Sequence, residues 1–418
     1  MKKLKVILVI ADGMGDRPLK ELGHKTPLEA ANTPALDHIA SSGVCGIMDP
    51  IAPGVRPGSD TSHLAILGYD PYKYYSGRGP FEALGAGMEL KEGDIAFRAN
   101  FATVQEKDNK LIVIDRRAGR KIPEGDAFTS ELSKMKLESA KDVEVIVKHT
   151  VEHRCVVVLR GRNLSHHVSD TDPHEEMVPI KECKPLSQDD AALRTAKMVN
   201  ELTYKSYQIL NSHPLNVERE KRGLPKVNCI LLRGAGVYRE IPSLQRRFGI
   251  KAACIAGAAL YKGVARAVGM EIIKVPGATG TYETDVIAKA RAAIDALRKY
   301  DFVFIHFKAT DNASHDGNIE MKIKMLEKFD VLVKYLIDNV NMDETIITVT
   351  SDHTTPISIR DHTGDPVPLA ICAPDVRRDD VEKFDERSCA RGHLGRIRGT
   401  DLMNILMDLA NRSEKFGA

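Results

Sequence analysis

The sequence predicts an α/β fold in which a mostly parallel sheet has helices on both faces and is interrupted by a smaller inserted α+β domain. Residues 6–11 form a continuous apolar run, which is typical of a central parallel strand covered on both sides. Similar runs recur with helical segments between them after residue 226. Between about residues 75 and 186 the pattern changes to short alternating segments, which favours a mainly antiparallel sheet.

The length and composition predict a two-domain cytoplasmic protein. A chain of 418 residues with 43% hydrophobic residues can form two cores, and we predict a core domain of residues 1–74 and 187–418 with an insertion at 75–186. The seven cysteines form no C-x-x-C motif, which favours a reducing compartment. No apolar run approaches a membrane span, and a net charge of +2 gives no general bias toward nucleic acid. The sequence leaves a homo-oligomer open.

The first part of the core domain begins with the strand at residues 6–11, which ends at Asp12 in a glycine-rich turn. Thr33 and Pro34 are typical of a helix start, and this helix is expected at residues 35–42, before Gly43. A turn is the simplest role for the segment at Asp12, and an exposed carboxylate at the end of the strand is the functional alternative.

A proline- and glycine-rich loop at residues 53–58 then leads into a predicted helix. Ser59, Asp60 and Thr61 all suit helix N-caps, so capping explains each of them. The functional alternative is a nucleophilic hydroxyl at the helix N-terminus, because this position favours an anion such as a phosphoserine. The two roles are compatible, and position alone does not choose between them.

The insertion is expected to contain four strands and a helix, at residues 95–104, 111–114, 143–147, 155–159 and 124–135. It also carries basic residues, for most of which an ordinary solvated surface is the simplest interpretation. The run from Asp115 through Arg116 and Arg117 to Arg120 is denser than usual, and Arg98 lies nearby in sequence. Such arginines can hold a carboxylate or phosphate through paired hydrogen bonds.

The second part of the core domain is expected to start with a long helix at residues 187–211 that returns the chain to the sheet. Strands and helices then alternate. Strands are expected at residues 227–232, 252–255, 271–275, 302–307, 345–350 and 369–372. Helices are expected at residues 258–268, 282–297, 319–340 and 401–411.

Three of the apolar strands are followed by an aspartate: Asp12, Asp311 and Asp352. Because parallel strands end on one rim of a sheet, these carboxylates can meet there. His315 is four residues after Asp311, and His353 and His362 follow the third strand. Carboxylates with imidazoles are ligands for Mn²⁺, Zn²⁺ and related ions, and the set is large enough for two. The recurrence of these residues at strand ends favours a metal site over polar turns.

These segments carry a family resemblance. Over essentially the whole chain the sequence resembles the archaeal-type cofactor-independent phosphoglycerate mutases of the alkaline phosphatase superfamily. The most specific matches are Arg56-Pro57-Gly58-Ser59-Asp60-Thr61-Ser62-His63-Leu64, Asp352-His353 and His362-Thr363-x-x-Pro366-Val367-Pro368. The resemblance implies an alkaline-phosphatase-like core, a phosphoglycerate substrate and two divalent metal ions, Mn²⁺ first, with Zn²⁺, Co²⁺ or Mg²⁺ as alternatives.

The resemblance also implies residue roles. One metal would be held by Asp311, His315 and His362, with His393 as a second choice for His362. The other would be held by Asp12, Ser59, Asp352 and His353. Ser59 would be the nucleophile, and Lys262 would contact the phosphoryl group. Among the insertion residues, Asp115 and Arg116 are the expected catalytic pair.

The expected reaction interconverts 3-phosphoglycerate and 2-phosphoglycerate through a phosphoserine. A phosphomonoesterase, phosphopentomutase or sulfatase-like hydrolase with the same site is the first alternative. A non-catalytic metal- and phosphate-binding protein is the second alternative, against which the presence of Ser59 argues, because binding alone needs no nucleophile.

Overall fold

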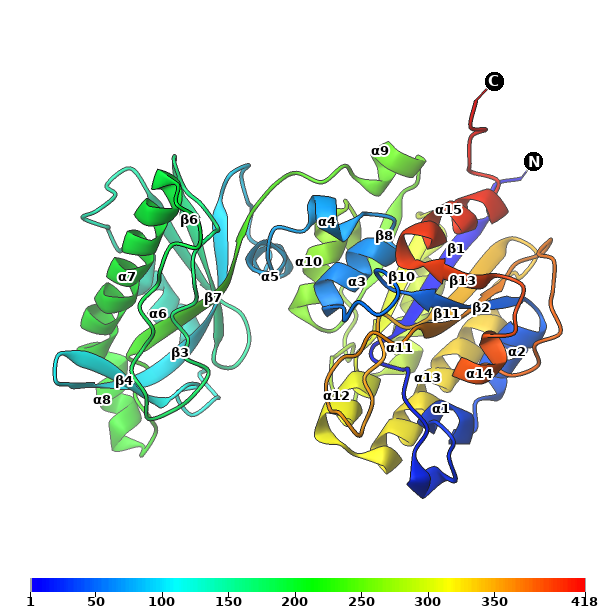
Figure 1. Cartoon of the computed structure of the whole chain (residues 1–418), viewed down its shortest axis with the longest axis horizontal. Coiled ribbons are helices and arrows are strands. Elements are labelled where there is room, and N and C mark those ends of the chain that lie inside the picture. The colour runs from blue at the N-terminus through cyan, green and yellow to red at the C-terminus, as the bar shows by residue number, and fades with distance from the viewer. Residues whose placement is uncertain (1, 418) are drawn as a thin grey trace. The chain divides into compact units, whose positions relative to one another are not determined.

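The computed structural model describes residues 2–417 and divides the chain into two compact units (Figure 1). Unit 1 comprises Met1–Tyr75 and Ile241–Ala418, and unit 2 comprises Ser76–Glu240. The chain therefore leaves unit 1 once, completes unit 2 and then returns. This is the inserted organisation that the sequence predicts, with a different end point for the insertion.

Unit 1 is built on an eight-stranded sheet with the order β13-β2-β12-β11-β1-β10-β8-β9. Its strands are β1 (Lys5–Ala11), β2 (Val44–Asp49), β8 (Ala252–Ile255), β9 (Glu271–Ile272), β10 (Phe302–Phe307), β11 (Thr345–Thr350), β12 (Val367–Cys372) and β13 (Gly395–Arg398). Strand β12 runs antiparallel to both of its neighbours, and the other pairings are parallel. The α/β class with a mostly parallel sheet is confirmed.

Helices cover both faces of this sheet, as predicted. Alternate residues of the central strands, such as Val9, Ile305 and Val349, pack in one buried cluster with α2, α11 and α13. The opposite face is covered by α3 and α10, whose His63 and Tyr261 lie against His306 of β10. The helices of unit 1 are η1 (Lys20–Leu22), α1 (Pro27–Ala30), α2 (Pro34–Ser41), α3 (Ser59–Ile66), α4 (Pro71–Tyr74), α9 (Leu244–Phe248), α10 (Ala259–Ala267), α11 (Val286–Ala296), α12 (Ala309–Asp316), α13 (Ile319–Asn339), α14 (Glu386–Cys389) and α15 (Gly399–Leu409).

Unit 2 contains a five-stranded antiparallel sheet in which β3 pairs with β4, β6 and β7, and β6 pairs with β5. The strands are β3 (Ile95–Lys107), β4 (Lys110–Asp115), β5 (Glu144–His149), β6 (Arg154–Arg160) and β7 (Cys229–Val237). The helices are α5 (Gly79–Gly85), α6 (Gly125–Leu132), α7 (Asp190–Asn211) and α8 (Pro214–Lys221). Helices α6 and α7 bury the face of β3 that carries Phe97 and Phe101.

The predicted end of the insertion at residue 186 differs from the structure, in which unit 2 continues to Glu240. Helix α7 does not return the chain to the sheet of unit 1, because its Val199 and Leu202 pack in the core of unit 2. Strand β7 likewise pairs with β3 of unit 2. The long helix and the strand after it are therefore parts of the insertion.

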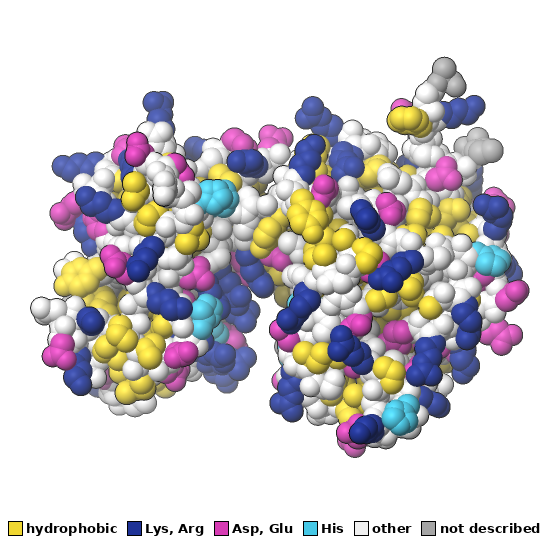
Figure 2. Space-filling model, in the orientation of Figure 1, with side chains coloured by type: hydrophobic (Ala, Val, Ile, Leu, Met, Phe, Trp, Pro, Cys, Tyr) yellow, Lys and Arg dark blue, Asp and Glu magenta, His cyan; other side chains and the backbone are white. Residues whose placement is uncertain are grey.

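The surface of the described residues carries charges of both signs. Figure 2 shows Lys and Arg side chains interspersed with Asp and Glu on this face of each unit, which agrees with the net charge of +2. The seven cysteines are all buried and free. Among residues 2–417, none of the helices combines the length and apolar character that a membrane crossing requires.

Candidate active site

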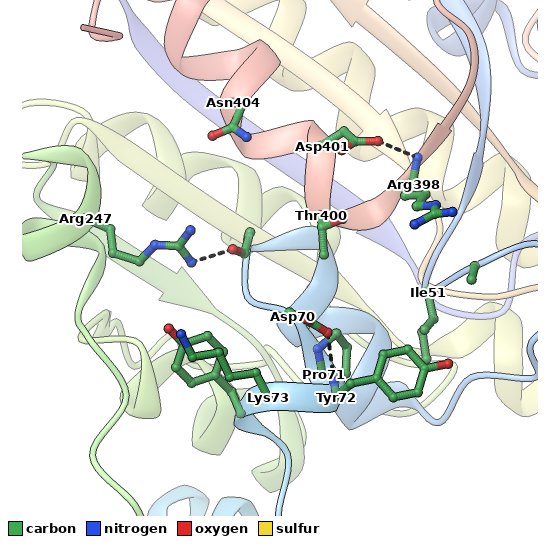
Figure 3. Close-up of a pocket in the computed structure, with 13 residues that line it drawn as sticks. Ile51, Asp70, Pro71, Tyr72, Lys73, Arg247, Arg398, Thr400, Asp401 and Asn404 are labelled. Atoms are coloured by element: carbon green, nitrogen blue, oxygen red, sulfur yellow. Dashed lines mark hydrogen bonds between the residues drawn. The ribbon is translucent and has the colours of Figure 1, made fainter. Parts of the chain in front are cut away.

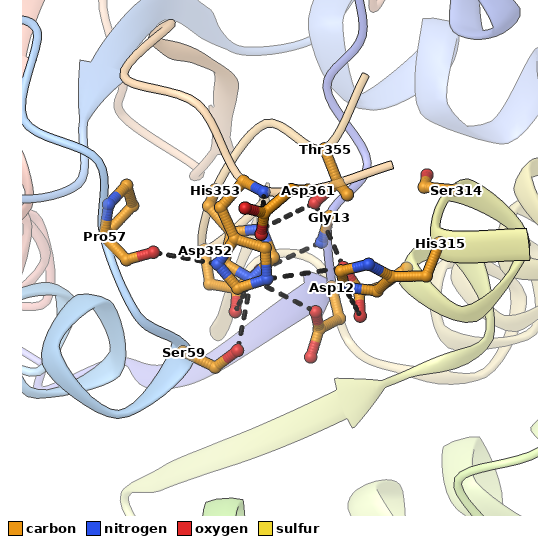
Figure 4. A network of polar contacts seen from close by, with 12 residues as sticks. Asp12, Gly13, Pro57, Ser59, Ser314, His315, Asp352, His353, Thr355 and Asp361 are labelled. Carbon is orange, nitrogen blue, oxygen red and sulfur yellow. Dashed lines mark hydrogen bonds and ion pairs between the residues drawn. The ribbon is translucent and has the colours of Figure 1, made fainter. Parts of the chain in front are cut away.

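The three predicted aspartates follow three neighbouring strands of unit 1. Strands β11, β1 and β10 are adjacent and parallel, so their carboxyl ends share one edge of the sheet. Asp12 directly follows β1, Asp352 follows β11, and Asp311 lies in the first turn of α12 after β10. Figure 4 shows the resulting network of polar contacts. All three carboxylates are buried, as a metal centre shielded from water requires.

Glycine at position 13 is needed for this convergence. Gly13 has a φ of 60°, and a Cβ there would lie 2.6 Å from Asp311 Oδ1. Its backbone N–H donates to Asp352 Oδ1 at 3.0 Å. The turn after β1 therefore brings the backbone between two of the carboxylates, where a larger residue would collide with Asp311.

Asp311, His315 and His362 form the first group whose ligand atoms lie close enough to hold one metal ion. His315 Nδ1 donates to the Arg360 carbonyl at 2.8 Å, and His362 Nδ1 donates to the Pro57 carbonyl at 2.8 Å. Both rings therefore turn Nε2 toward Asp311, at 3.3 and 3.8 Å from its carboxylate oxygens. Backbone acceptors that fix the tautomer and direction of a ligating imidazole are typical of metal sites.

Asp12, Asp311 and His353 form the second such group, so Asp311 belongs to both. Thr355 Oγ1 donates its one proton to Asp311 at 3.0 Å and therefore accepts from His353 Nδ1 at 2.9 Å. His353 Nε2 is consequently unprotonated and faces Asp12 Oδ1 at 3.4 Å. The resemblance implied Asp352 for this set and Asp311 only for the first, and the structure brings Asp311 into both.

Asp352 nevertheless faces the second group. Its Oδ2 lies 3.2 Å from His353 Nε2 and 3.5 Å from His63 Nδ1, and it is a buried oxygen without a hydrogen bond. A buried carboxylate oxygen beside an imidazole lone pair is unfavourable unless a cation lies between them. The donor set and this unsatisfied oxygen therefore fit a divalent metal ion.

Ser59 is the first residue of α3 and is buried next to the second group. Its Oγ lies 3.2 Å from His353 Nε2, which as an acceptor can take the hydroxyl proton (Figure 4). The helix N-terminus favours negative charge at this position. Ser62, the other hydroxyl of this turn, is fully buried and donates to the Ser59 carbonyl at 3.2 Å. Ser59 is therefore the hydroxyl that points toward the carboxylates and imidazoles.

The charges of this centre differ strongly in their environments. Burial opposes ionisation of Asp12, but the Lys308 ammonium and a hydrogen bond from His306 hold the pKa of its carboxyl well below the usual range. Burial and the charge of Asp12 raise the pKa of Asp352 well above the usual range. Burial lowers the pKa of His353 to about 3, so this imidazole is neutral. A neutral imidazole is the form that binds metal ions.

Sequence analysis missed two residues of this centre, Lys308 and His306. Lys308 Nζ contacts Asp12 Oδ1 at 3.2 Å and also forms an ion pair with Asp311. His306 Nε2 lies 2.9 Å from Asp12 Oδ2, and its ring stacks on Tyr261 at 3.5 Å between centroids. His306 lies within β10, and its side chain reaches the same edge of the sheet. The alternation of side chains along this strand could have indicated which face it occupies. Lys308 carried no signal beyond its place at the strand end.

A buried lysine, Lys322 of α13, supports the turns that carry the aspartates. Its ammonium bonds the carbonyls of Gly15 and Thr355, each at 3.1 Å, and the Asp16 carboxylate at 2.7 Å. Gly15 follows β1 and Thr355 follows β11, so one cation ties together both turns. Since Lys322 is fully buried, these bonds are shielded from water and hold the turns firmly.

Two predicted residues of unit 1 lie outside the centre. Lys262 of α10 is half-buried, and burial together with the nearby charges of Arg266 and Lys274 lowers its pKa. Its role at the phosphoryl group stays a prediction. His393 is exposed and does not belong to either candidate ligand group found among residues 2–417, whereas His362 belongs to one.

In unit 2 the two predicted catalytic residues have structural partners. Both oxygens of Asp115 accept backbone N–H groups of its own turn, from Arg117 and Gly119, each at 2.7 Å. Arg116 binds Asp172 through two hydrogen bonds of 2.9 and 2.7 Å. Asp115 therefore shapes the turn, and Arg116 neutralises a buried carboxylate. Arg120 lies at the surface in an ion pair with Glu152.

A different set of arginines gathers in unit 2, on the face of the sheet opposite α6 and α7. Arg98 of β3 lies directly across from Arg233 of β7, and Asn100 lies directly across from Arg154 of β6. We call Arg98, Arg154 and Arg233 the unit 2 arginine group. Facing like charges across strands is unfavourable unless an anion lies between them. Sequence analysis proposed only Arg98 of this group.

The arginine group has unused hydrogen-bonding capacity. Arg98 Nε, Arg233 Nε and His153 Nδ1 are buried atoms without a hydrogen bond. Burial, followed by the charges of neighbouring arginines, lowers the pKa of Arg98 to about 9 despite the counter-charge of Glu82. Arg98 remains protonated at neutral pH. Unsatisfied buried donors of this kind are suited to a carboxylate or phosphate.

A separate cavity of about 510 Å³ in unit 1 contains none of the predicted site residues (Figure 3). Several of its charged residues have structural tasks. Asp70 accepts the Tyr72 N–H at 2.9 Å, and Asp401 accepts the Arg398 N–H at 2.9 Å. Arg247 binds the Gly68 carbonyl. The convergence of carboxylates and imidazoles places the candidate site at the edge of the sheet instead.

Comparison with known proteins identifies the family of this chain. The model of the metalloenzyme superfamily matches residues 4–409. The chain is 52% identical to the 2,3-bisphosphoglycerate-independent phosphoglycerate mutase of Ignicoccus hospitalis over 419 residues, covering 100% of both chains. It is 50% identical to phosphoglycerate mutase 1 of the same type from Methanocaldococcus jannaschii, again over 100% of both chains.

Solved structures give the same result. A protein of Pyrococcus horikoshii shares 41% identity and a TM-score of 0.86, with 100% of each chain covered. The cofactor-independent phosphoglycerate mutase of Thermoplasma acidophilum shares 38% identity and a TM-score of 0.73, covering 97% of this chain and 100% of its own. With the family model matching nearly the whole chain, the sequence belongs to the metalloenzyme superfamily and, within it, to the archaeal-type 2,3-bisphosphoglycerate-independent phosphoglycerate mutases.

Proposed function

We propose that this mutase interconverts 3-phosphoglycerate and 2-phosphoglycerate through a phosphoserine at Ser59. Ser59 Oγ attacks the phosphorus, the bond from phosphorus to the 3-oxygen breaks, and the serine proton ends on that oxygen. Glycerate then turns within the site. Its 2-hydroxyl oxygen attacks the phosphorus, the bond from phosphorus to Ser59 Oγ breaks, and the hydroxyl proton ends on Ser59 Oγ. No second phosphorylated compound is consumed.

The observation that carries this proposal is the position of Ser59. The hydroxyl is buried at the start of α3 and faces His353 Nε2 at 3.2 Å, in the middle of the candidate ligand set. The helix N-terminus stabilises the negative charge of a phosphoserine there. A protein that only bound metal or phosphate would have no need of a hydroxyl aimed at this centre.

Two divalent metal ions complete the proposed centre. Asp311, His315 and His362 would hold one ion, and Asp12, Asp311, Asp352, His353 and Ser59 would surround the other. Bound there, the ions would neutralise charge on the transferring group and make Ser59 easier to deprotonate. Mixed carboxylate and imidazole ligands favour Mn²⁺, with Zn²⁺, Co²⁺ or Mg²⁺ as alternatives.

The unit 2 arginine group would bind the carboxylate of glycerate and restrain it while it turns. Guanidinium groups match carboxylates through two parallel hydrogen bonds, and Arg98 and Arg233 each have a buried Nε that makes no hydrogen bond. Asp172 would keep the group in place, since it pairs with Arg116 and lies 3.9 Å from Arg233. The excess of positive charge suits a substrate with both a carboxylate and a phosphate.

The test of the function is a coupled assay. With 3-phosphoglycerate, enolase and Mn²⁺, and with no added 2,3-bisphosphoglycerate, the enzyme should form phosphoenolpyruvate continuously. Inorganic phosphate should stay near the level of an enzyme-free control, because the phosphoryl group returns to glycerate. Rapid phosphate release without 2-phosphoglycerate would assign the protein as a phosphomonoesterase instead.

Replacing Arg98 by Ala should impair substrate binding without removing the metals. Losing one charged hydrogen-bond donor should lower kcat/KM about 10- to 200-fold, mainly through KM. The matched control is Arg120→Ala, since Arg120 is an exposed arginine of the same unit. Steady-state kinetics and metal analysis of both variants give the answer. Equal kinetics for the two variants would contradict the role of the arginine group.

A further inference from the structure

One cation already lies inside the proposed metal centre. Lys308 Nζ contacts Asp12 Oδ1 at 3.2 Å and forms an ion pair with Asp311 Oδ2. Asp12 Oδ1 is also the oxygen that faces His353 Nε2, and Asp311 Oδ2 is the oxygen that faces His315 Nε2. The ammonium thus contacts two carboxylate oxygens that also face an imidazole of a candidate ligand group.

Beside Lys308, the proposed metal centre has little positive charge to balance its carboxylates. Three carboxylates, those of Asp12, Asp311 and Asp352, are buried within this centre. His353 turns a nitrogen without a proton toward Asp12, because its Nδ1 donates to Thr355 Oγ1. Buried carboxylates repel one another strongly when no cation separates them. In the absence of metal, Lys308 is the lysine that directly bridges two of them.

A metal ion can also displace the Lys308 ammonium from the carboxylates. The Lys308 side chain is 20% exposed, whereas those of Asp12 and Asp311 are at most 2% exposed. The lysine side chain is therefore the one of the three that solvent partly reaches. Its aliphatic stem lies beside Gly280, where a Cβ would come within 3.8 Å of Lys308 Cβ and Cγ.

We propose that Lys308 is the resident counter-ion of the metal-free centre, which holds Asp12 and Asp311 together and which the metal ions displace when they bind. This inference rests on the proposed two-metal function. It explains how the carboxylates of Asp12 and Asp311 can be preassembled in one buried place before any metal arrives. It also means that each metal ion competes with the ammonium for the carboxylates. Metal affinity is therefore lower than the ligand set alone would give.

The test is a comparison of Lys308→Met with the parent enzyme, after chelation and then titration with Mn²⁺ by calorimetry. The variant should bind Mn²⁺ at least about tenfold more tightly, because the competing charge has gone. Its metal-free form should unfold roughly 5–15 °C lower, because the carboxylates then lack a partner. Saturating Mn²⁺ should remove most of that difference. The opposite signs of the two effects distinguish displacement from a merely structural role.

Two variants serve as controls. Lys308→Arg keeps the charge and should keep Mn²⁺ affinity within a few-fold of the parent. Lys289→Met removes another buried lysine of unit 1, whose ammonium bonds the carbonyls of His306 and Thr279 at 3.0 and 3.3 Å. Because it lies on backbone oxygens, its loss should lower stability with and without metal alike and leave Mn²⁺ affinity nearly unchanged.

Each result decides the inference. Lys308→Met that folds only with Mn²⁺ supports it, because the metal then replaces the ammonium. Unchanged or weaker Mn²⁺ binding by Lys308→Met overturns it while leaving the two-metal function standing, as does a variant that cannot fold even with Mn²⁺. A parent enzyme that binds neither Mn²⁺ nor Co²⁺ overturns both the inference and the proposed metal centre.

Discussion

Ser59→Ala should lose essentially all mutase turnover, on the order of 10⁴- to 10⁶-fold in kcat, while keeping its fold and its metals. The loss is this large because the hydroxyl itself carries the phosphoryl group, and no neighbouring atom can replace it. The metals should remain, since Asp12, Asp352 and His353 would still surround their ion. Coupled assays and metal analysis measure the two properties separately.

Ser62→Ala is the matched control, because it removes a buried hydroxyl from the same helical turn. Ser62 donates to the Ser59 carbonyl and does not contact the ligand set, so most activity should survive. Mass spectrometry of parent enzyme quenched during turnover should locate the phosphate on Ser59. A phosphopeptide that maps elsewhere, or an active Ser59→Ala enzyme, would overturn the mechanism.

Asp311→Ala should deprive the enzyme of both metal ions and lower activity at least about 10³-fold. Asp311 belongs to both ligand groups, so its loss weakens two sites at once, and each ion contributes several kcal/mol of transition-state stabilisation. His315→Ala, which removes a ligand of the first group alone, should spare the second ion. Elemental analysis after dialysis against Mn²⁺ gives the count for each variant.

Asp316→Ala provides the control for Asp311, since it removes an exposed carboxylate from the same helix. Asp316 accepts a hydrogen bond from Tyr282 and takes no part in either ligand group. It should retain both ions and near-normal turnover. Chelation of the parent enzyme should likewise abolish activity, and Mn²⁺, Co²⁺ or Zn²⁺ should restore it. Full activity in protein freed of metal would refute the two-metal proposal.

The strands that carry the site could be predicted from sequence because they are buried on both faces. Strands β10 and β11 coincide with the predicted ranges, since a continuous apolar run has one stable environment in a parallel sheet. Strands β2 and β13 were not predicted, for a physical reason. Gly46 is atypical of a strand, so the sequence of β2 does not have a strand pattern. A Cβ at this position would lie 2.7 Å from the Gly395 carbonyl of β13. Glycine therefore permits the pairing of β2 with β13, although it makes β2 difficult to recognise in the sequence.

The arginine group could not be predicted because it depends on strand register. Arg98 and Arg233 are far apart in sequence and meet only because β3 pairs with β7. Strand β7 also continues through Gly234 and Gly236 to Val237, beyond the predicted strand end at residue 232. Lys308 was missed for the opposite reason. A lysine after a strand is ordinary, and only its distances to two carboxylates give it a function.

The two ends of unit 2 lie beside each other. Ser76 donates to the Val237 carbonyl at 2.5 Å, and Gly77 approaches Ala235 so closely that a Cβ would lie 2.1 Å from its carbonyl oxygen. Unit 2 could therefore be deleted from the gene, or replaced by a domain of another length, with only a short connection needed between its two ends. Recombination at this point would change what is recognised while the eight-stranded sheet kept its register. Descendants acting on new phosphate esters could arise without rebuilding the chemistry.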